Sequence, residues 1–148
     1  MKKIITLVAA LFLSLSSPLS LLAQESPVRA AYYYKVKWGY QEEFESLFFK
    51  NHYPVLKAQM GDHGRITSVE VMRPTYHGDG RADWTFLVVI TFASNAAFVG
   101  PNQESAIQMR LYPDQATFQK EERRRFEILD AHWDVPLVRV VPPGPQAP

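Results

Sequence analysis

Hydrophobic and polar residues alternate in some segments of this sequence and recur at helical spacing in others. Residues 29–38 (RAAYYYKVKW) are rich in tyrosine and valine and lack proline and glycine, which is typical of a β-strand. Alternation places Tyr32, Tyr34 and Trp38 on one face of this strand. In residues 41–60, apolar side chains instead recur three and four positions apart, which predicts an amphipathic helix.

The same two periods predict the rest of the chain. Residues 83–92 (DWTFLVVITF) are apolar at both alternating sets of positions, as in a strand buried on both faces. Pro136 within the last strand indicates an edge position or a bulge, and Pro54 predicts a kink in the first helix that frees the Lys50 carbonyl. The predicted elements are strand 29–38, helix 41–60, strand 65–73, strand 83–92, a short helix ending at Val99, helix 114–130 and strand 133–141.

This order predicts an α+β fold of the ferredoxin-like type, β-α-β-β-α-β, with one antiparallel four-stranded sheet. If the helices cover one face of that sheet, the other face stays bare, although strand 83–92 is apolar on both sides. We therefore expect a homodimer in which two sheets pack face to face around a two-fold axis, forming a dimeric α/β barrel.

The amino-terminal segment is typical of a secretory signal peptide. Lys2 and Lys3 precede an apolar run that ends at Leu13, and Ala23 is a small residue in front of a polar stretch. The alternative is an uncleaved membrane anchor, which Pro18 and four serines disfavour. The expected organisation is a signal peptide at 1–23, a leader at 24–28, a single α+β barrel domain at 29–141 and a disordered proline-rich tail at 142–148. The protein is thus expected to be exported, periplasmic or secreted, with no membrane contact after signal removal.

Composition excludes several classes of function. The chain has no cysteine, which excludes disulfides, iron–sulfur clusters and thiol catalysis. Its 16 basic and 15 acidic residues give a net charge of +1, so no nucleic-acid partner is expected. The four histidines lack the close spacing of a zinc helix, and we predict no metal site; the alternative is a composite site near His63 and His77. No phosphate loop, dinucleotide fingerprint or nucleophile elbow is present.

Three local patterns give the sequence a family resemblance. They are Phe44-x3-Phe48-x3-His52-x-Pro54, the strand-to-helix segment 92–98 (FASNAAF), and the ending 132–136 (HWDVP). Together with the order of elements, residues 29–141 resemble the dimeric α/β-barrel superfamily, which includes the EthD-like, NIPSNAP-like and antibiotic-biosynthesis-monooxygenase-like families. The resemblance implies a pocket between the helices and the sheet. It does not fix one activity, because the superfamily includes monooxygenases, decarboxylases, cyclases and haem-handling proteins.

His52 is the main candidate for catalysis. It lies four residues after Phe48 and three before Val55, inside the apolar arc of the helix, so its imidazole is expected to face the sheet. Histidine titrates near neutral pH and can act as a general acid or base. The alternative is a core histidine that is hydrogen-bonded to the backbone or to a tyrosine.

Tyr34 is the second catalytic candidate, because a phenol on a pocket wall can hydrogen-bond a substrate oxygen. The residues expected to bind substrate are Tyr32, Trp38, Phe48, Trp84, Phe86 and Arg73. The alternative for the aromatic residues is packing in the core or dimer interface, and for Arg73 a solvent-facing strand end. We interpret Glu122 and Arg125, in the run 120–125 (KEERRR), as part of a solvated helix face; the alternative is an inward polar pair.

Three functions are compatible with these patterns. The first is an enzyme without a tightly bound cofactor that transfers a proton on an aromatic or polyketide-like compound, as in monooxygenase, cyclase or decarboxylase chemistry. The second is a binding or sensing module for haem or another hydrophobic ligand. The third is a structural dimer with a filled core. A cavity that reaches His52 would favour the first two.

Overall fold

The computed structural model describes residues 26–61, 64–75, 83–140, 142 and 144. The predicted signal peptide, the turn at His63, the loop around His77 and most of the proline-rich tail lie outside the described residues. The described elements are β1 (Val28–Val36), α1 (Gln41–Leu47), a π-helical turn (Phe48–His52), α2 (Tyr53–Lys57), β2 (Ile66–Met72), β3 (Phe86–Phe92), α3 (Asn95–Val99), α4 (Glu104–Leu111), α5 (Gln115–Glu127) and β4 (Leu129–Leu137). None of the helices in this part of the chain is both long and apolar enough to span a lipid bilayer.

The four strands form one antiparallel sheet in the order β2-β3-β1-β4. This is the strand order of a ferredoxin-like fold, and it confirms the predicted fold class. Strand β4 lies at the edge and contains Pro136, as predicted. In the register, Tyr32 lies between Val88 and Asp134, and two residues further Tyr34 lies between Phe86 and His132.

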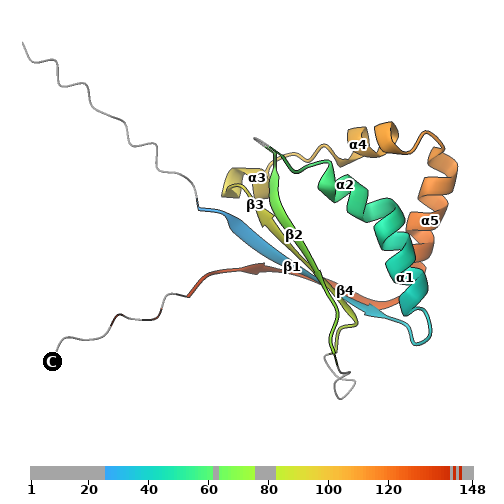
Figure 1. The fold of residues 1–148 in the computed structure, drawn as a ribbon, viewed down its shortest axis with the longest axis horizontal. Coiled ribbons are helices and arrows are strands. Elements are labelled where there is room, and N and C mark those ends of the chain that lie inside the picture. Colours follow the sequence, from blue (N-terminus) through green and yellow to red (C-terminus); the bar gives the residue numbers. More distant parts are fainter. Residues whose placement is uncertain (1–25, 62–63, 76–82, 141, 143, 145–148) are drawn as a thin grey trace, which may run out of the picture.

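The helices α1, α2 and α5 cover one face of this sheet (Figure 1). One side of each central strand points into this helix-covered core, because side chains alternate along a strand. The core is mostly aromatic and β-branched, and its buried members are Ala30, Tyr34, Val36, Phe44, Phe48, Leu56, Ile66, Phe86, Val88, Ile90, Phe92 and Ile128.

The opposite face of the sheet carries a second apolar cluster. Ala31, Leu87 and Val89 form its centre, with Tyr33 and Trp84 packed around them. Tyr33 also stacks on the indole of Trp133, with ring centroids 5.3 Å apart. No helix of the described residues covers this face (Figure 1). Strand β3 is thus apolar on both sides, as the sequence pattern predicted, and a second copy of the chain is the expected cover.

Two aromatic residues lie elsewhere than predicted, because the strands are shorter than their sequence patterns. Strand β1 ends at Val36, so Trp38 follows it in a turn and is 86% exposed. Strand β3 begins at Phe86, because the Thr85 hydroxyl accepts the Val36 N–H in place of a strand carbonyl. Alternation therefore does not extend to Trp84, which packs against Tyr33 on the far face.

Replacing Val89 by aspartate is expected to convert a dimer into a monomer. Val89 lies at the centre of the far-face cluster, where an unpaired carboxylate would be desolvated by a partner sheet at a cost of several kcal/mol. A stable dimer interface buries roughly 1,200–2,000 Å² in total. A charge at the centre of this interface should therefore prevent the two sheets from packing. Light scattering at micromolar concentration measures the result. Val88→Ala, which removes volume from the helix-covered core, should lower the melting temperature and leave the dimer intact. A monomeric wild-type protein would contradict the predicted homodimer.

Candidate functional site

The chain between α1 and α2 forms a π-helical turn over Phe48–His52. Pro54 has no N–H, so the carbonyl of Lys50 loses its helical donor. The Tyr112 hydroxyl lies 2.9 Å from both the Lys50 and the Asn51 carbonyl oxygens, and one hydroxyl proton is shared between them. The predicted free carbonyl is confirmed, and the helix is interrupted by a π-helical turn where a kink was predicted. Insertions of this kind are frequent at functional sites.

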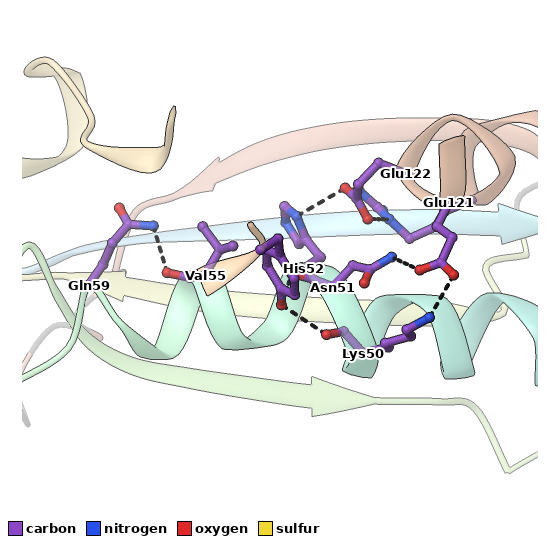
Figure 2. Close-up of polar contacts among 9 residues, drawn as sticks. Lys50, Asn51, His52, Val55, Gln59, Glu121 and Glu122 are labelled. Carbon is purple, nitrogen blue, oxygen red and sulfur yellow. Dashed lines mark hydrogen bonds and ion pairs between the residues drawn. The ribbon is translucent and has the colours of Figure 1, made fainter. Parts of the chain in front are cut away.

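Two side chains of this turn are held by α5. The buried Asn51 amide donates a hydrogen bond of 2.9 Å to one carboxylate oxygen of Glu121, and the Lys50 ammonium lies 2.6 Å from the other. Figure 2 shows both contacts, with His52 extending from the same turn towards Glu122. The direction of His52 is therefore fixed by its neighbours in the chain and by the adjacent helix.

His52, Glu122 and Arg125 form a polar group between the turn and α5. The Nδ1 atom of His52 lies 3.7 Å from one carboxylate oxygen of Glu122. Both carboxylate oxygens also accept hydrogen bonds from Arg125, at 3.0 Å from Nε and 2.7 Å from Nη2. Burial would raise the pKa of the Glu122 carboxyl, but its interactions with His52 and Arg125 lower it to about 2. Glu122 is thus an anion at neutral pH.

Arg125 points into the core rather than to solvent, contrary to its interpretation as part of a solvated helix face. Its side chain is 1% exposed, and its guanidinium lies over the Phe126 ring at 4.5 Å from the centroid. Among the described residues, its Nη1 atom is the one buried side-chain nitrogen or oxygen without a hydrogen-bonding partner. A buried donor without a partner is costly, so this position is a candidate site for an acceptor.

A cavity of about 200 Å³ lies beside this polar group, between the helices and the sheet. It brings together His52, Tyr34 and Tyr32, three of the residues that the sequence singled out. The full lining is Tyr32, Tyr34, His52, Leu56, Val88, Ile90, Glu104, Arg125, Phe126, His132 and Asp134. The catalytic candidates thus share one cavity, at the location that the resemblance implied.

Tyr34 is a protonated phenol in this cavity at neutral pH. Burial raises the pKa of its hydroxyl to about 12, although the nearby charge of Arg125 acts in the opposite direction. The Tyr34 ring stacks on the imidazole of His132, with centroids 4.2 Å apart. Both ring nitrogens of His132 face acceptors. Its Nδ1 atom lies 2.8 Å from the Tyr33 carbonyl oxygen, and its Nε2 atom lies 3.2 Å from the Asp134 carboxylate.

The other predicted substrate-binding residues do not line this cavity. Phe48 and Phe86 are fully packed core residues in mutual contact, with centroids 4.9 Å apart. Trp38 and Trp84 lie away from the cavity for the reasons given above. Arg73 is three-quarters exposed beyond the end of β2 and faces Glu45 at 3.6 Å, so the solvent-facing alternative holds for this residue.

Sequence reasoning did not assign Glu104, His132 or Asp134 to the site. Glu104 begins α4, so the segment between Val99 and Asp114 forms a wall of the cavity. His132 and Asp134 come from β4, which starts four residues earlier than predicted because α5 ends at Glu127. The described residues contain no group of three or more potential ligands that could hold a metal ion.

A larger cavity of about 520 Å³ lies next to α2, α3 and α4, away from His52. Its charged residue is Arg65, whose guanidinium donates to the carbonyls of Ala97 and Phe98 at 2.6 and 3.0 Å. These donors are already used within the protein. The smaller cavity, with its titratable groups and partnerless donor, is therefore the better candidate for chemistry.

Comparison with known proteins finds distant structural similarities. No protein-family model and no curated protein matches it. Among solved structures it is similar to a NIPSNAP family protein from Agrobacterium tumefaciens str. C58, with 12% identity, a TM-score of 0.47 and coverage of 78% of this chain and 88% of that one. It is similar to a DABB family protein with a ferredoxin-like fold from Mesorhizobium loti MAFF303099, with 14% identity, a TM-score of 0.45 and coverage of 78% of this chain and 98% of that one. A third similar structure is SnoaB, a cofactor-independent oxygenase from Streptomyces nogalater, with 17% identity, a TM-score of 0.44 and coverage of 80% of this chain and 98% of that one.

Proposed function

We propose that this chain is an exported, homodimeric enzyme that binds a small aromatic carbonyl compound and transfers a proton between a carbon of that compound and His52, without a tightly bound cofactor. The observation that carries the proposal is the position of His52 between the Glu122 carboxylate and the cavity. Proton transfer is common to the monooxygenase, cyclase and decarboxylase chemistry considered above. Export rests on the sequence pattern of residues 1–23 alone.

In this proposal His52 is the general base. The Glu122 carboxylate lies 3.7 Å from Nδ1, and its negative charge favours the tautomer with a proton on Nδ1 and a lone pair on Nε2. The lone pair takes a proton from the carbon next to the substrate carbonyl. The electrons of that C–H bond move into the carbonyl, which becomes an enolate, and His52 becomes an imidazolium that Glu122 stabilises.

The enolate oxygen needs donors that are in place before the reaction. The Tyr34 hydroxyl is one, because burial keeps it protonated at neutral pH. Arg125 adds positive charge and a partnerless Nη1 next to the same wall. Donors oriented in a site from which water is largely excluded stabilise developing negative charge more than water does.

The size of the cavity discriminates between the candidate ligands. A cavity of about 150 Å³ holds benzene, and typical ligand pockets measure about 300–1,000 Å³. The 200 Å³ cavity therefore supports a single substituted ring. It gives no support to haem, whose macrocycle is much larger, and its polar lining does not favour a purely structural dimer.

Exchange of the methyl protons of para-hydroxyacetophenone in heavy water tests the proposal, with NMR as the measurement. We expect the protein to accelerate the exchange above the buffer rate, and Tyr34→Phe to slow it by about 10- to 100-fold, the worth of a hydrogen bond to a charged oxygen. Tyr33→Phe is the matched control, because Tyr33 is the neighbouring tyrosine on the far face. Equal rates for the two variants would contradict the assigned role of Tyr34.

A further inference from the structure

The cavity has two chemically different ends. Tyr32 and Tyr34 both line it and are two residues apart on β1, which separates their positions by about 7 Å along the strand. Tyr34 lies at the end with His52 and Arg125. Tyr32 lies at the end with Asp134, its partner in the sheet register, and with Glu104.

The Tyr32 end is acidic. Burial raises the pKa of the Tyr32 hydroxyl, and the negative charges of Asp134 and Glu104 raise it further, while Arg65 acts in the opposite direction. The Asp134 carboxylate lies 3.2 Å from the Nε2 atom of His132, whose ring stacks on Tyr34, so its charge also acts on the Tyr34 hydroxyl. Within the described part of the chain, no side chain bonds to or pairs with the Glu104 carboxylate. This end therefore presents hydrogen-bond acceptors to a ligand.

The opposite end presents donors. The Tyr34 hydroxyl and the buried guanidinium of Arg125 lie there, and the Nη1 atom of Arg125 has no acceptor among the described residues. The apolar part of the lining consists of Leu56, Val88, Ile90 and Phe126. Such a cavity fits a flat ring along its length, with one polar substituent at each end.

We propose that the ligand of this cavity is a ring with a hydrogen-bond acceptor at one end and a hydrogen-bond donor at the other. A carbonyl or enolate oxygen lies at the Arg125 and Tyr34 end. A hydroxyl or amino group donates to Glu104 and Asp134. This inference rests on the proposed function for the orientation of the carbonyl, and it adds a substrate class, the para-substituted aromatic carbonyl compounds that carry a donor.

Three compounds of similar size test the inference by calorimetric titration of the full chain. para-Hydroxyacetophenone has both polar groups, para-methoxyacetophenone lacks the donor, and para-ethylphenol lacks the acceptor. We expect each of the last two to bind about tenfold more weakly than the first, because one buried hydrogen bond is lost. The double variant Glu104→Met/Asp134→Leu should bind the hydroxy and methoxy ketones equally. The control Glu70→Met changes an exposed carboxylate of β2 that pairs with Arg29, and should keep the tenfold difference.

Failure of this inference and failure of the proposed function give different results. Equal binding of the two ketones by the wild-type protein, or an unchanged ratio in a folded double variant, overturns the two-ended ligand. Both ketones should then still exchange their methyl protons if the proposed function is right. Binding with the expected ratios but without exchange would instead refute the proton transfer. Absence of binding of all three compounds overturns the ligand class.

Discussion

Replacing His52 by alanine is expected to lower the rate of proton exchange by about 10²–10⁴-fold, the usual worth of a general acid or base. The same change should leave the fold intact. The imidazole is 22% exposed, and its ion-pair contact with the Glu122 carboxylate is long, at 3.7 Å. A histidine that only filled the core would behave differently. Its loss would cost about 1–3 kcal/mol of stability through unpaired partners. Melting temperature and exchange rate, measured on one variant, separate the two roles.

His132→Ala is the informative control for this experiment, because His132 is the second histidine of the same cavity. Both of its ring nitrogens are directed at groups of the protein, the Tyr33 carbonyl and the Asp134 carboxylate, and neither is directed at a ligand. Its removal should therefore reduce exchange much less than the loss of His52. If His52→Ala melts much earlier but keeps full activity once folded, His52 is not the catalytic base.

Local sequence patterns were sufficient to place His52 and Tyr34. Helical spacing from Phe48 and strand alternation from Tyr32 each act over a few residues. The strand period holds at Tyr34, and His52 still lines the cavity although the π-helical turn interrupts the helical period there. The consequence of Pro54 was also local, since a missing N–H frees one known carbonyl. That the Tyr112 hydroxyl would take it depends on a contact 62 residues away, which no local pattern encodes.

Patterns failed where a distant partner decides the position of a residue. In α5 the apolar Phe126 is 51% exposed, and its neighbour Arg125 has the buried position instead. In the run KEERRR an arginine is typical of a solvated face. Its burial depends on the Glu122 carboxylate, which neutralises it, and on Phe44 and Phe126, whose rings lie against the guanidinium. The spacing of Glu122 three residues before Arg125 was the signal, and the alternative of an inward polar pair is the one that holds.

The acidic end of the cavity was unpredictable for another reason. Asp134 reaches the cavity because it pairs with Tyr32 in the sheet, and this register is fixed only when β4 aligns with β1. A strand shifted by one residue would turn Asp134 to the other face. Glu104 belongs to a helix with hardly any amphipathic pattern, so the direction of its side chain was not predictable from the pattern of residues.

Replacing Glu122 by methionine is expected to cost about 3–5 kcal/mol of stability, the largest effect of any single change considered. The variant leaves the fully buried guanidinium of Arg125 without its counter-ion, and breaking one side of a buried pair is costly for that reason. Glu122→Met/Arg125→Met removes both charges and should recover most of the loss. Urea unfolding, with ligand binding as a check on the fold, measures the difference. Glu43→Met is the control. Glu43 of α1 pairs with Arg124, the neighbour of Arg125 on α5, and this exposed pair should contribute little to stability.

The pH dependence of the free energy of unfolding tests the Glu122–Arg125 pair independently. The pKa of Glu122 falls from its ordinary 4.5 to about 2 on folding, so the carboxylate stabilises the folded state above about pH 4.5 and loses that contribution as the pH falls towards 2. The contribution at neutral pH is about 2–3 kcal/mol after allowance for partial exposure. Wild-type stability should decline over this acidic range, and the double variant should lack that part of the decline. If both proteins lose stability in parallel, the acid sensitivity comes from other carboxylates, and Glu122 is not the anion that holds Arg125 and His52 in the cavity wall.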